Sequence, residues 1–97
     1  MHASTDPVKA KIEPHGGLLL VPRADGLASV IDAGVGQYTL VFDQDCDTKD
    51  YVAVCTTDTR GSAHEREELG RTKSEYPISV EKEGKCVDAS VNAIIFR

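Results

Sequence analysis

Apolar and polar residues alternate most strictly over residues 37–43, QYTLVFD. Successive side chains of a β-strand point to opposite faces, so this spacing predicts a strand. Tyr38, Leu40 and Phe42 share one face of it, which we expect to be buried. The preceding Gly-Val-Gly, Gly34–Gly36, supplies the positive φ angles of a hairpin turn. It lacks the third glycine or following lysine of a phosphate-binding loop, and a strand follows it instead of a helix.

Six further stretches have the pattern or composition of strands. They are Val8–Glu13, Leu18–Pro22, the incoming arm of a hairpin over Leu27–Asp43, Tyr51–Thr57, Tyr76–Lys82 and Ser90–Phe96. Pro14 and Pro22 are expected to end the first two, with a turn over the Arg-Ala-Asp-Gly that follows the second. Residues 51–57 are apolar on both faces, which is typical of a central strand. About seven short strands at a spacing of roughly 8–12 residues predict an all-β fold, an antiparallel β-sandwich or a small barrel.

The chain of 97 residues is long enough for one domain. We predict that residues 1–7 form a flexible lead-in and that residues 8–97 form a single β-sandwich domain. The apolar strand residues are expected to supply the core or the packing between subunits. These residues are Tyr38, Leu40, Phe42, Val52, Val54, Ile78, Val80, Ile94 and Phe96.

Residues 58–75 interrupt the strand pattern with a dense run of charges. Apolar residues are too few here for a packed helix, so we expect a solvated loop with at most one short helical turn. Ser62, His64 and the nearby glutamates hold the ingredients of acid–base chemistry, but a charged loop without a rigid scaffold does not aim them. We therefore predict that the chain is not an enzyme.

Aspartates gather after the strand at 37–43, at positions Asp43, Asp45, Asp47 and Asp50. Their spacing suggests an irregular Ca²⁺ site as an alternative. An EF-hand loop is excluded, because its sixth and twelfth positions, Gly and Glu, are occupied here by Thr48 and Val54. The favoured interpretation is a solvated connection, in which Asp side chains bond nearby backbone amides.

Three cysteines are present, Cys46, Cys55 and Cys86. They lack the short Cys-x-x-Cys spacing of zinc sites, even with His64 added, so we expect no metal and no cofactor. Three thiols in a reducing compartment is the simplest interpretation, while a bridge between Cys46 and Cys86 stays open. Cys55 lies in an apolar strand and is expected in the core.

The charge of the chain excludes two classes of partner. Sixteen acidic and eleven basic residues give a net charge of −5, and no basic stripe accompanies the aromatic residues. We therefore expect neither nucleic-acid binding nor attraction to an anionic membrane. The apolar runs, such as Leu18–Val21, are too short for a signal peptide or a membrane span.

The order of these motifs resembles a family of small C-terminal β-modules in phage tail fibres and other virion proteins, with relatives in bacterial surface proteins. The family pattern V-x-x-x-G-x-G-x-Y-x-V-x-F corresponds to Val30–Phe42, a Y-x-V-x strand to Tyr51–Val54, and the ending D-x-x-V-x-x-x-V-F to Asp88–Phe96. The resemblance covers residues 17–97. It departs at Asp32 and Ala33, where other members often carry an apolar–Thr–Arg run, and in the unusually charged loop.

The resemblance implies a non-enzymatic virion module of the tail-fibre or capsid-decoration type, assembled in the host cytoplasm. Such modules associate with themselves, often as homotrimers, and with other virion proteins, and they serve in host attachment. Loops on a rigid sheet commonly carry recognition, so we expect partner contacts at Asp45–Asp50 and Arg60–Arg71. The chief candidates are Asp45, Asp47, Arg60, His64 and Arg66.

Two other binding functions remain alternatives. A bacterial carbohydrate-binding module requires an exposed aromatic platform, for which only Tyr51 and Tyr76 are candidates. A Ca²⁺-dependent surface adhesion module would use the four aspartates at 43–50.

Overall fold

The structure is a computed structural model that describes residues 6–15, 18–58, 61–66 and 68–97. These residues contain nine β-strands and no helix. The strands are β1 (Val8–His15), β2 (Leu18–Asp25), β3 (Leu27–Gly34), β4 (Gln37–Phe42), β5 (Val52–Thr57), β6 (Ser62–Glu65), β7 (Glu75–Lys82), β8 (Lys85–Cys86) and β9 (Val91–Phe96).

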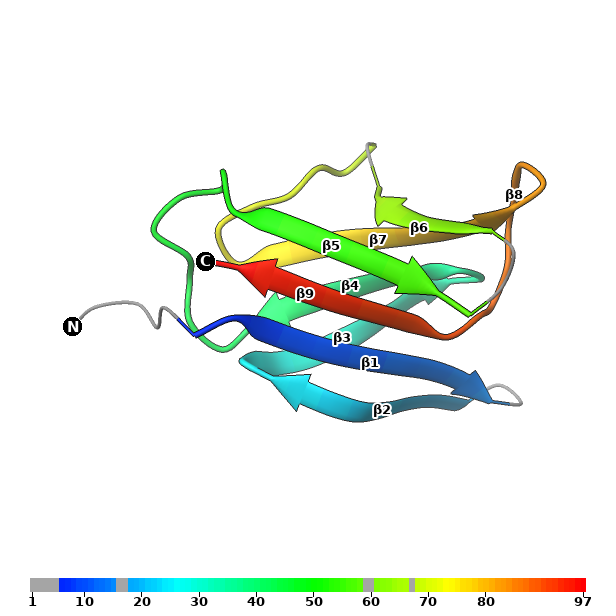
Figure 1. Cartoon of the computed structure of the whole chain (residues 1–97), viewed down its shortest axis with the longest axis horizontal. Helices are drawn as coiled ribbons and strands as arrows, with labels where there is room; N and C mark the ends of the chain where they lie inside the picture. The colour runs from blue at the N-terminus through cyan, green and yellow to red at the C-terminus, as the bar shows by residue number, and fades with distance from the viewer. Residues whose placement is uncertain (1–5, 16–17, 59–60, 67) are drawn as a thin grey trace.

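The strands form two antiparallel sheets that lie face to face (Figure 1). Sheet A has the order β2-β1-β9-β5, and sheet B has the order β3-β4-β7-β6, with the short β8 paired to β7. The chain passes from sheet A to sheet B at Gly26, which has a φ of +80° between β2 and β3. The expected all-β antiparallel sandwich is confirmed.

The hairpin predicted around Gly34 and Gly36 is present as β3 and β4. Both glycines have positive φ, +133° and +66°. Tyr38, Leu40 and Phe42 are at most 4% exposed and point inward together, as the alternation required. The prediction held because the opposite face of β4 is mostly polar, which leaves only one register that buries the apolar side chains.

One buried cluster draws side chains from both sheets and from the β4–β5 connection. Its members are Val8, Ala10, Ile12, Tyr38, Leu40, Phe42, Cys46, Tyr51, Tyr76, Ile78, Val80, Val91, Ala93 and Ile95. A single shared core supports one domain over the described residues. Most of the expected lead-in, residues 1–5, lies outside the described residues.

The two prolines expected to end strands lie inside them instead. β1 continues through Pro14 to His15, and β2 continues through Pro22 to Asp25, so the turn expected at residues 23–26 reduces to Gly26. Proline is tolerated where no neighbour needs its N–H. β2 has a partner on one side only, and β1 pairs with β9 only up to Ile12.

The prediction that residues 51–57 form a central strand is wrong, because β5 is the edge strand of sheet A. The register of β9 also differs from the prediction. Val91, Ala93 and Ile95 point inward, and the larger Ile94 and Phe96 point outward. Both faces of β9 carry apolar residues, so alternation alone does not identify the buried one.

The charged segment at 58–75 contains a strand, which was not predicted, and a turn in which the Leu69 and Gly70 N–H groups donate to the Arg66 carbonyl at 3.3 Å and 3.0 Å. β6 pairs with β7, with His64 opposite Ser79, so Ser62 and His64 lie on sheet B and not in a loop. β6 and the two-residue β8 bring the number of strands in the described residues from the predicted seven to nine.

Candidate interaction surface

Four large apolar side chains lie together on the outer face of sheet A. Val52 stands directly opposite Phe96, and Val54 stands directly opposite Ile94, on the adjacent strands β5 and β9. Their exposed fractions are 60%, 52%, 49% and 38%, in that order. We call these four residues the apolar strip. They were expected in the core or in packing between subunits, and the core assignment is wrong for all four.

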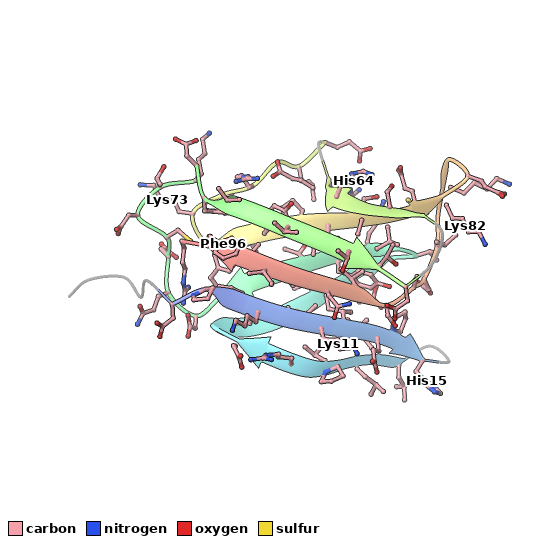
Figure 2. All side chains as sticks on the ribbon, in the orientation of Figure 1. Lys11, His15, His64, Lys73, Lys82 and Phe96 are labelled. Carbon is pink, nitrogen blue, oxygen red and sulfur yellow. The ribbon has the colours of Figure 1, made fainter. Side chains whose placement is uncertain are left out.

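Charged side chains lie beside the strip on the same face. Lys9 and Lys11 on β1 stand opposite Ile94 and Asn92 on β9, and Figure 2 shows Lys11 and Phe96 on this face. Lys11 forms an ion pair with Glu13 at 3.4 Å between Nζ and Oε1. The strip is therefore bounded on its β1 side by charged side chains, while β5 forms its other side at the edge of the sheet.

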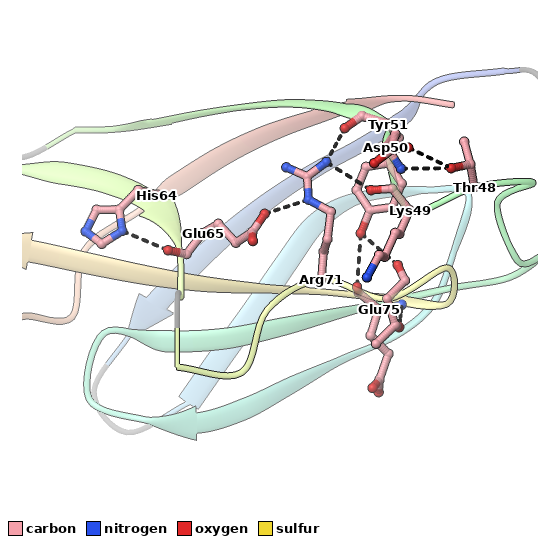
Figure 3. Close-up of polar contacts among 9 residues, drawn as sticks. Thr48, Lys49, Asp50, Tyr51, His64, Glu65, Arg71 and Glu75 are labelled. Atoms are coloured by element: carbon pink, nitrogen blue, oxygen red, sulfur yellow. Dashed lines mark hydrogen bonds and ion pairs between the residues drawn. The ribbon is translucent and has the colours of Figure 1, made fainter.

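Arg71 holds the charged 66–74 loop against the sandwich (Figure 3). Its Nε donates to Glu65 Oε1 at 2.7 Å, and its Nη1 donates to the carbonyl oxygens of Tyr51 and Lys49. The guanidinium carbon lies 4.6 Å from the centre of the Tyr51 ring and 5.4 Å from that of Tyr76. The planar cation is thus packed against two aromatic rings while its donors are used.

Tyr51 fixes the same loop from the core side. Its hydroxyl oxygen lies 2.9 Å from the Thr72 carbonyl oxygen and 3.0 Å from that of Glu75, so its single proton is shared between these two acceptors. Burial raises the pKa of Tyr51 above its usual value, and the nearby Arg71 charge opposes part of that rise. Tyr51 and Tyr76 are 5% and 3% exposed, so neither provides the aromatic platform on which the carbohydrate-binding alternative depended.

The two loops expected to carry partner contacts meet at Arg71. Lys49 and Asp50 of one loop and Glu65, Gly70 and Arg71 of the other line a depression of about 310 Å³. Its charges are mixed, and the guanidinium is already paired.

The five candidate contact residues occupy separate places. Asp45 and Asp47 are exposed in the β4–β5 connection, and Arg60 lies outside the described residues. His64 lies on β6 with its Nε2 3.2 Å from Glu81 Oε2. The backbone N–H of Arg66 donates to the Pro77 carbonyl, and its side chain donates to Glu68 at 3.2 Å. The structure does not bring the four described residues, Asp45, Asp47, His64 and Arg66, together as one site.

The aspartates of the β4–β5 connection have different environments. Asp43 accepts from Arg97 Nη1 at 3.5 Å, and the Asp50 backbone N–H donates to Thr48 Oγ1 at 3.1 Å. Within the described residues, no three His, Cys, Asp or Glu side chains are grouped as metal ligands would be. The Ca²⁺ alternative therefore gains no support.

Cys46, Cys55 and Cys86 are free thiols. Cys46 lies in the β4–β5 connection and is buried, and its backbone N–H donates to the Lys73 carbonyl at 2.8 Å. Burial raises the pKa of Cys55 to about 11. A raised pKa keeps a thiol protonated and unreactive at neutral pH.

Asp88 fastens the turn between β3 and β4 to the segment before β9. Its Oδ1 accepts from the Gly36 N–H at 2.8 Å and from the Tyr38 hydroxyl at 3.3 Å. Burial and the charge of Asp88 raise the pKa of Tyr38 to about 12. We did not single out Asp88 from the sequence, although the glycine–tyrosine and final-strand motifs contain all three residues.

No family model, curated protein or solved structure matches this chain. The described residues contain no helix that is both long and apolar enough to cross a membrane. The apolar strip is therefore the feature of the described surface from which a function is best argued.

Proposed function

We propose that the chain is a non-enzymatic structural module of a phage-type particle, of the tail-fibre or capsid-decoration type. Its role is to pack against copies of itself and against other particle proteins, and to contact the host surface. The apolar strip is the observation that carries this proposal, and the virion context comes from the resemblance of the sequence motifs.

The grouping of four large exposed apolar side chains on two adjacent strands supports a role in association. Large contiguous apolar patches on a soluble domain mark interaction sites more often than isolated exposed residues do. A domain of 97 residues has a small core and gains stability when association buries more apolar surface. The three free thiols are compatible with synthesis in a reducing host cytoplasm.

Light scattering coupled to size exclusion tests the association. We expect the parent chain to run as an oligomer, for which the family resemblance suggests three copies. Ile94→Thr places a hydroxyl in the strip and should shift the chain toward the monomer. Ile31→Thr is the matched control, because Ile31 is 47% exposed on β3 of the other sheet.

A parent chain that stays monomeric at every accessible concentration would refute self-association through the strip. An equal loss of mass in Ile94→Thr and Ile31→Thr would show that general surface hydrophobicity, rather than the strip, drives association.

A further inference from the structure

We propose that β5 pairs edge to edge with β5 of a second copy of this chain, about a two-fold axis. The two copies of sheet A then become one continuous antiparallel sheet. This inference rests on the proposed self-association and specifies its contact and symmetry. It favours pairs of chains, whereas the count of three comes from the family resemblance alone.

Three of the four edge strands carry features that discourage pairing with another chain. β2 contains Pro22, Arg23 and Asp25, together with an irregular register against β1. β3 has two register shifts against β4 and carries Asp32. β6 is only four residues long and includes His64 and Glu65. Prolines, charges, bulges and short length are the usual protections of an edge.

β5 has none of these protections. Its sequence, Val-Ala-Val-Cys-Thr-Thr, contains no charge and no proline, and its register against β9 runs without a shift. In the described part of the chain β9 is its only hydrogen-bonded strand partner, and the edge strand β6 of the facing sheet lies close to it. The Arg71 side chain reaches the carbonyl of Tyr51, one residue before the strand begins.

The hydrogen-bond pattern identifies which backbone groups of β5 point outward. The Asp58 N–H donates to the Ser90 carbonyl at 3.3 Å, in continuation of the β5–β9 register. The backbone N–H and C=O groups of successive residues point alternately to the two sides of an antiparallel strand. The backbone groups of Val54 and Thr56 therefore point toward β9, and those of Ala53 and Cys55 point toward the free edge. By the same alternation the Tyr51 carbonyl points away from β9, and it accepts a hydrogen bond from Arg71.

A two-fold pairing centred on Val54 uses these outward groups. It places Ala53 opposite Cys55 of the second copy, so that each exchanges backbone hydrogen bonds with the other. Val54 then stands opposite Val54 of the second copy, which extends the row of Ile94 and Val54 across the junction. No charged side chain on β5 opposes its copy, although the whole chain carries a net charge of −5.

Amide hydrogen exchange on the parent chain tests the pairing directly. We expect the Ala53 and Cys55 amides to exchange rapidly in dilute solution and to become protected as concentration rises. The Val54 and Thr56 amides, which face β9, should be protected throughout and serve as the internal control. Ala53 and Cys55 amides whose exchange does not change between monomer and oligomer would overturn the proposal.

Ala53→Pro provides the matching substitution, because proline is tolerated in an edge strand when the lost N–H points outward. Ala63→Pro is the control. The Arg66 N–H bonds Pro77 across the β6–β7 ladder, so the Ala63 N–H points away from β7 at the edge of the other sheet. We expect Ala53→Pro to weaken association by at least about tenfold and Ala63→Pro to leave it unchanged.

The outcomes separate this inference from the proposed function. If Ala53→Pro keeps the parent mass while Ile94→Thr loses it, association through the strip stands and edge pairing is refuted. A stable mass of three chains also refutes the two-fold pairing. A monomeric parent refutes both. If Ala53→Pro fails to fold, the amide exchange of the parent decides.

Discussion

Gly36→Ala is the substitution for which the structure predicts the clearest cost. Gly36 has a φ of +66°, which side chains of L-residues rarely adopt. A Cβ built there lies 2.6 Å from the Val87 carbonyl oxygen, 2.7 Å from that of Val80 and 2.8 Å from the Val87 nitrogen. All three are backbone atoms, so no side-chain rotation relieves the contact.

The expected loss of stability combines two costs and one compensating gain. The left-handed conformation costs an alanine about 1–2 kcal/mol. Inserting a methyl group into occupied space typically costs about 1–3 kcal/mol more. The lower entropy of the unfolded alanine chain returns about 0.4–1 kcal/mol. The net loss is about 1–5 kcal/mol, and each 1 kcal/mol lowers the melting temperature of a domain of this size by about 4–8 °C.

Gly84→Ala is the matched control, because Gly84 has a φ of +78° but no atom within 4 Å of a built Cβ. It isolates the conformational cost, which we expect to lower the free energy of unfolding by only about 1 kcal/mol. Urea unfolding followed by circular dichroism measures both variants against the parent. If the two variants lose the same stability, the close packing of Gly36 against the backbone of Val80 and Val87 is refuted.

Three further changes test the core, its ionisation and the loop anchor. Phe42→Ala should lower the free energy of unfolding by about 3–5 kcal/mol in urea melts, because Phe42 is 4% exposed, and a melt like that of the parent would refute its inward position. Raising the pH should destabilise the protein, since burial raises the pKa of Tyr38 to about 12 and raises those of Tyr51 and Tyr76. The contribution of these tyrosines to stability is fully present below the pKa of an unfolded tyrosine, about 10. It is lost as pH rises through the raised pKa values of the folded state, by up to about 1.4 kcal/mol per pH unit for each tyrosine. A urea midpoint that stays constant above that pH would contradict their burial. Arg71→Lys should cost about 1–3 kcal/mol in the same assay, because lysine cannot reproduce the planar stacking and the several donors, and retention of parent stability would show that the charge alone suffices.

The fold was predictable where polar and apolar residues separate between the two faces of a strand. In β4 only one register buries Tyr38, Leu40 and Phe42 together, and the structure has that register. In β9 both faces are apolar, and the small Ala93 points inward while Phe96 points outward. Ala93 lies opposite Ala10 of β1, so its place is set by a pairing between the two ends of the chain. Periodicity carries no information on that pairing.

The residues that hold the loops together were not predictable from local pattern. Arg71 contacts Tyr51 across twenty residues of sequence, and Asp88 contacts Tyr38 across fifty. In the sequence of a charged segment, an arginine that will stack on aromatic rings has the same kind of neighbouring residues as an arginine that will be solvated. The partial signal for Asp88 was its recurrence with Gly36 and Tyr38 in the motifs of the resembling family. We read those motifs as turn and core positions and not as one hydrogen-bonded group.

The wrong placement of β5 also bears on the proposed assembly. A strand that is apolar on both faces and free of charge is typical of the centre of a sheet. A central strand is paired on both sides, so it needs no charge or proline to prevent pairing with another chain. Among the described residues of one chain, β9 is the only strand that is hydrogen-bonded to β5. A sequence pattern does not distinguish a neighbour in the same chain from one in another chain. The pattern and the edge position are reconciled if the second neighbour of β5 belongs to another copy, which is the arrangement that the exchange of the Ala53 and Cys55 amides tests.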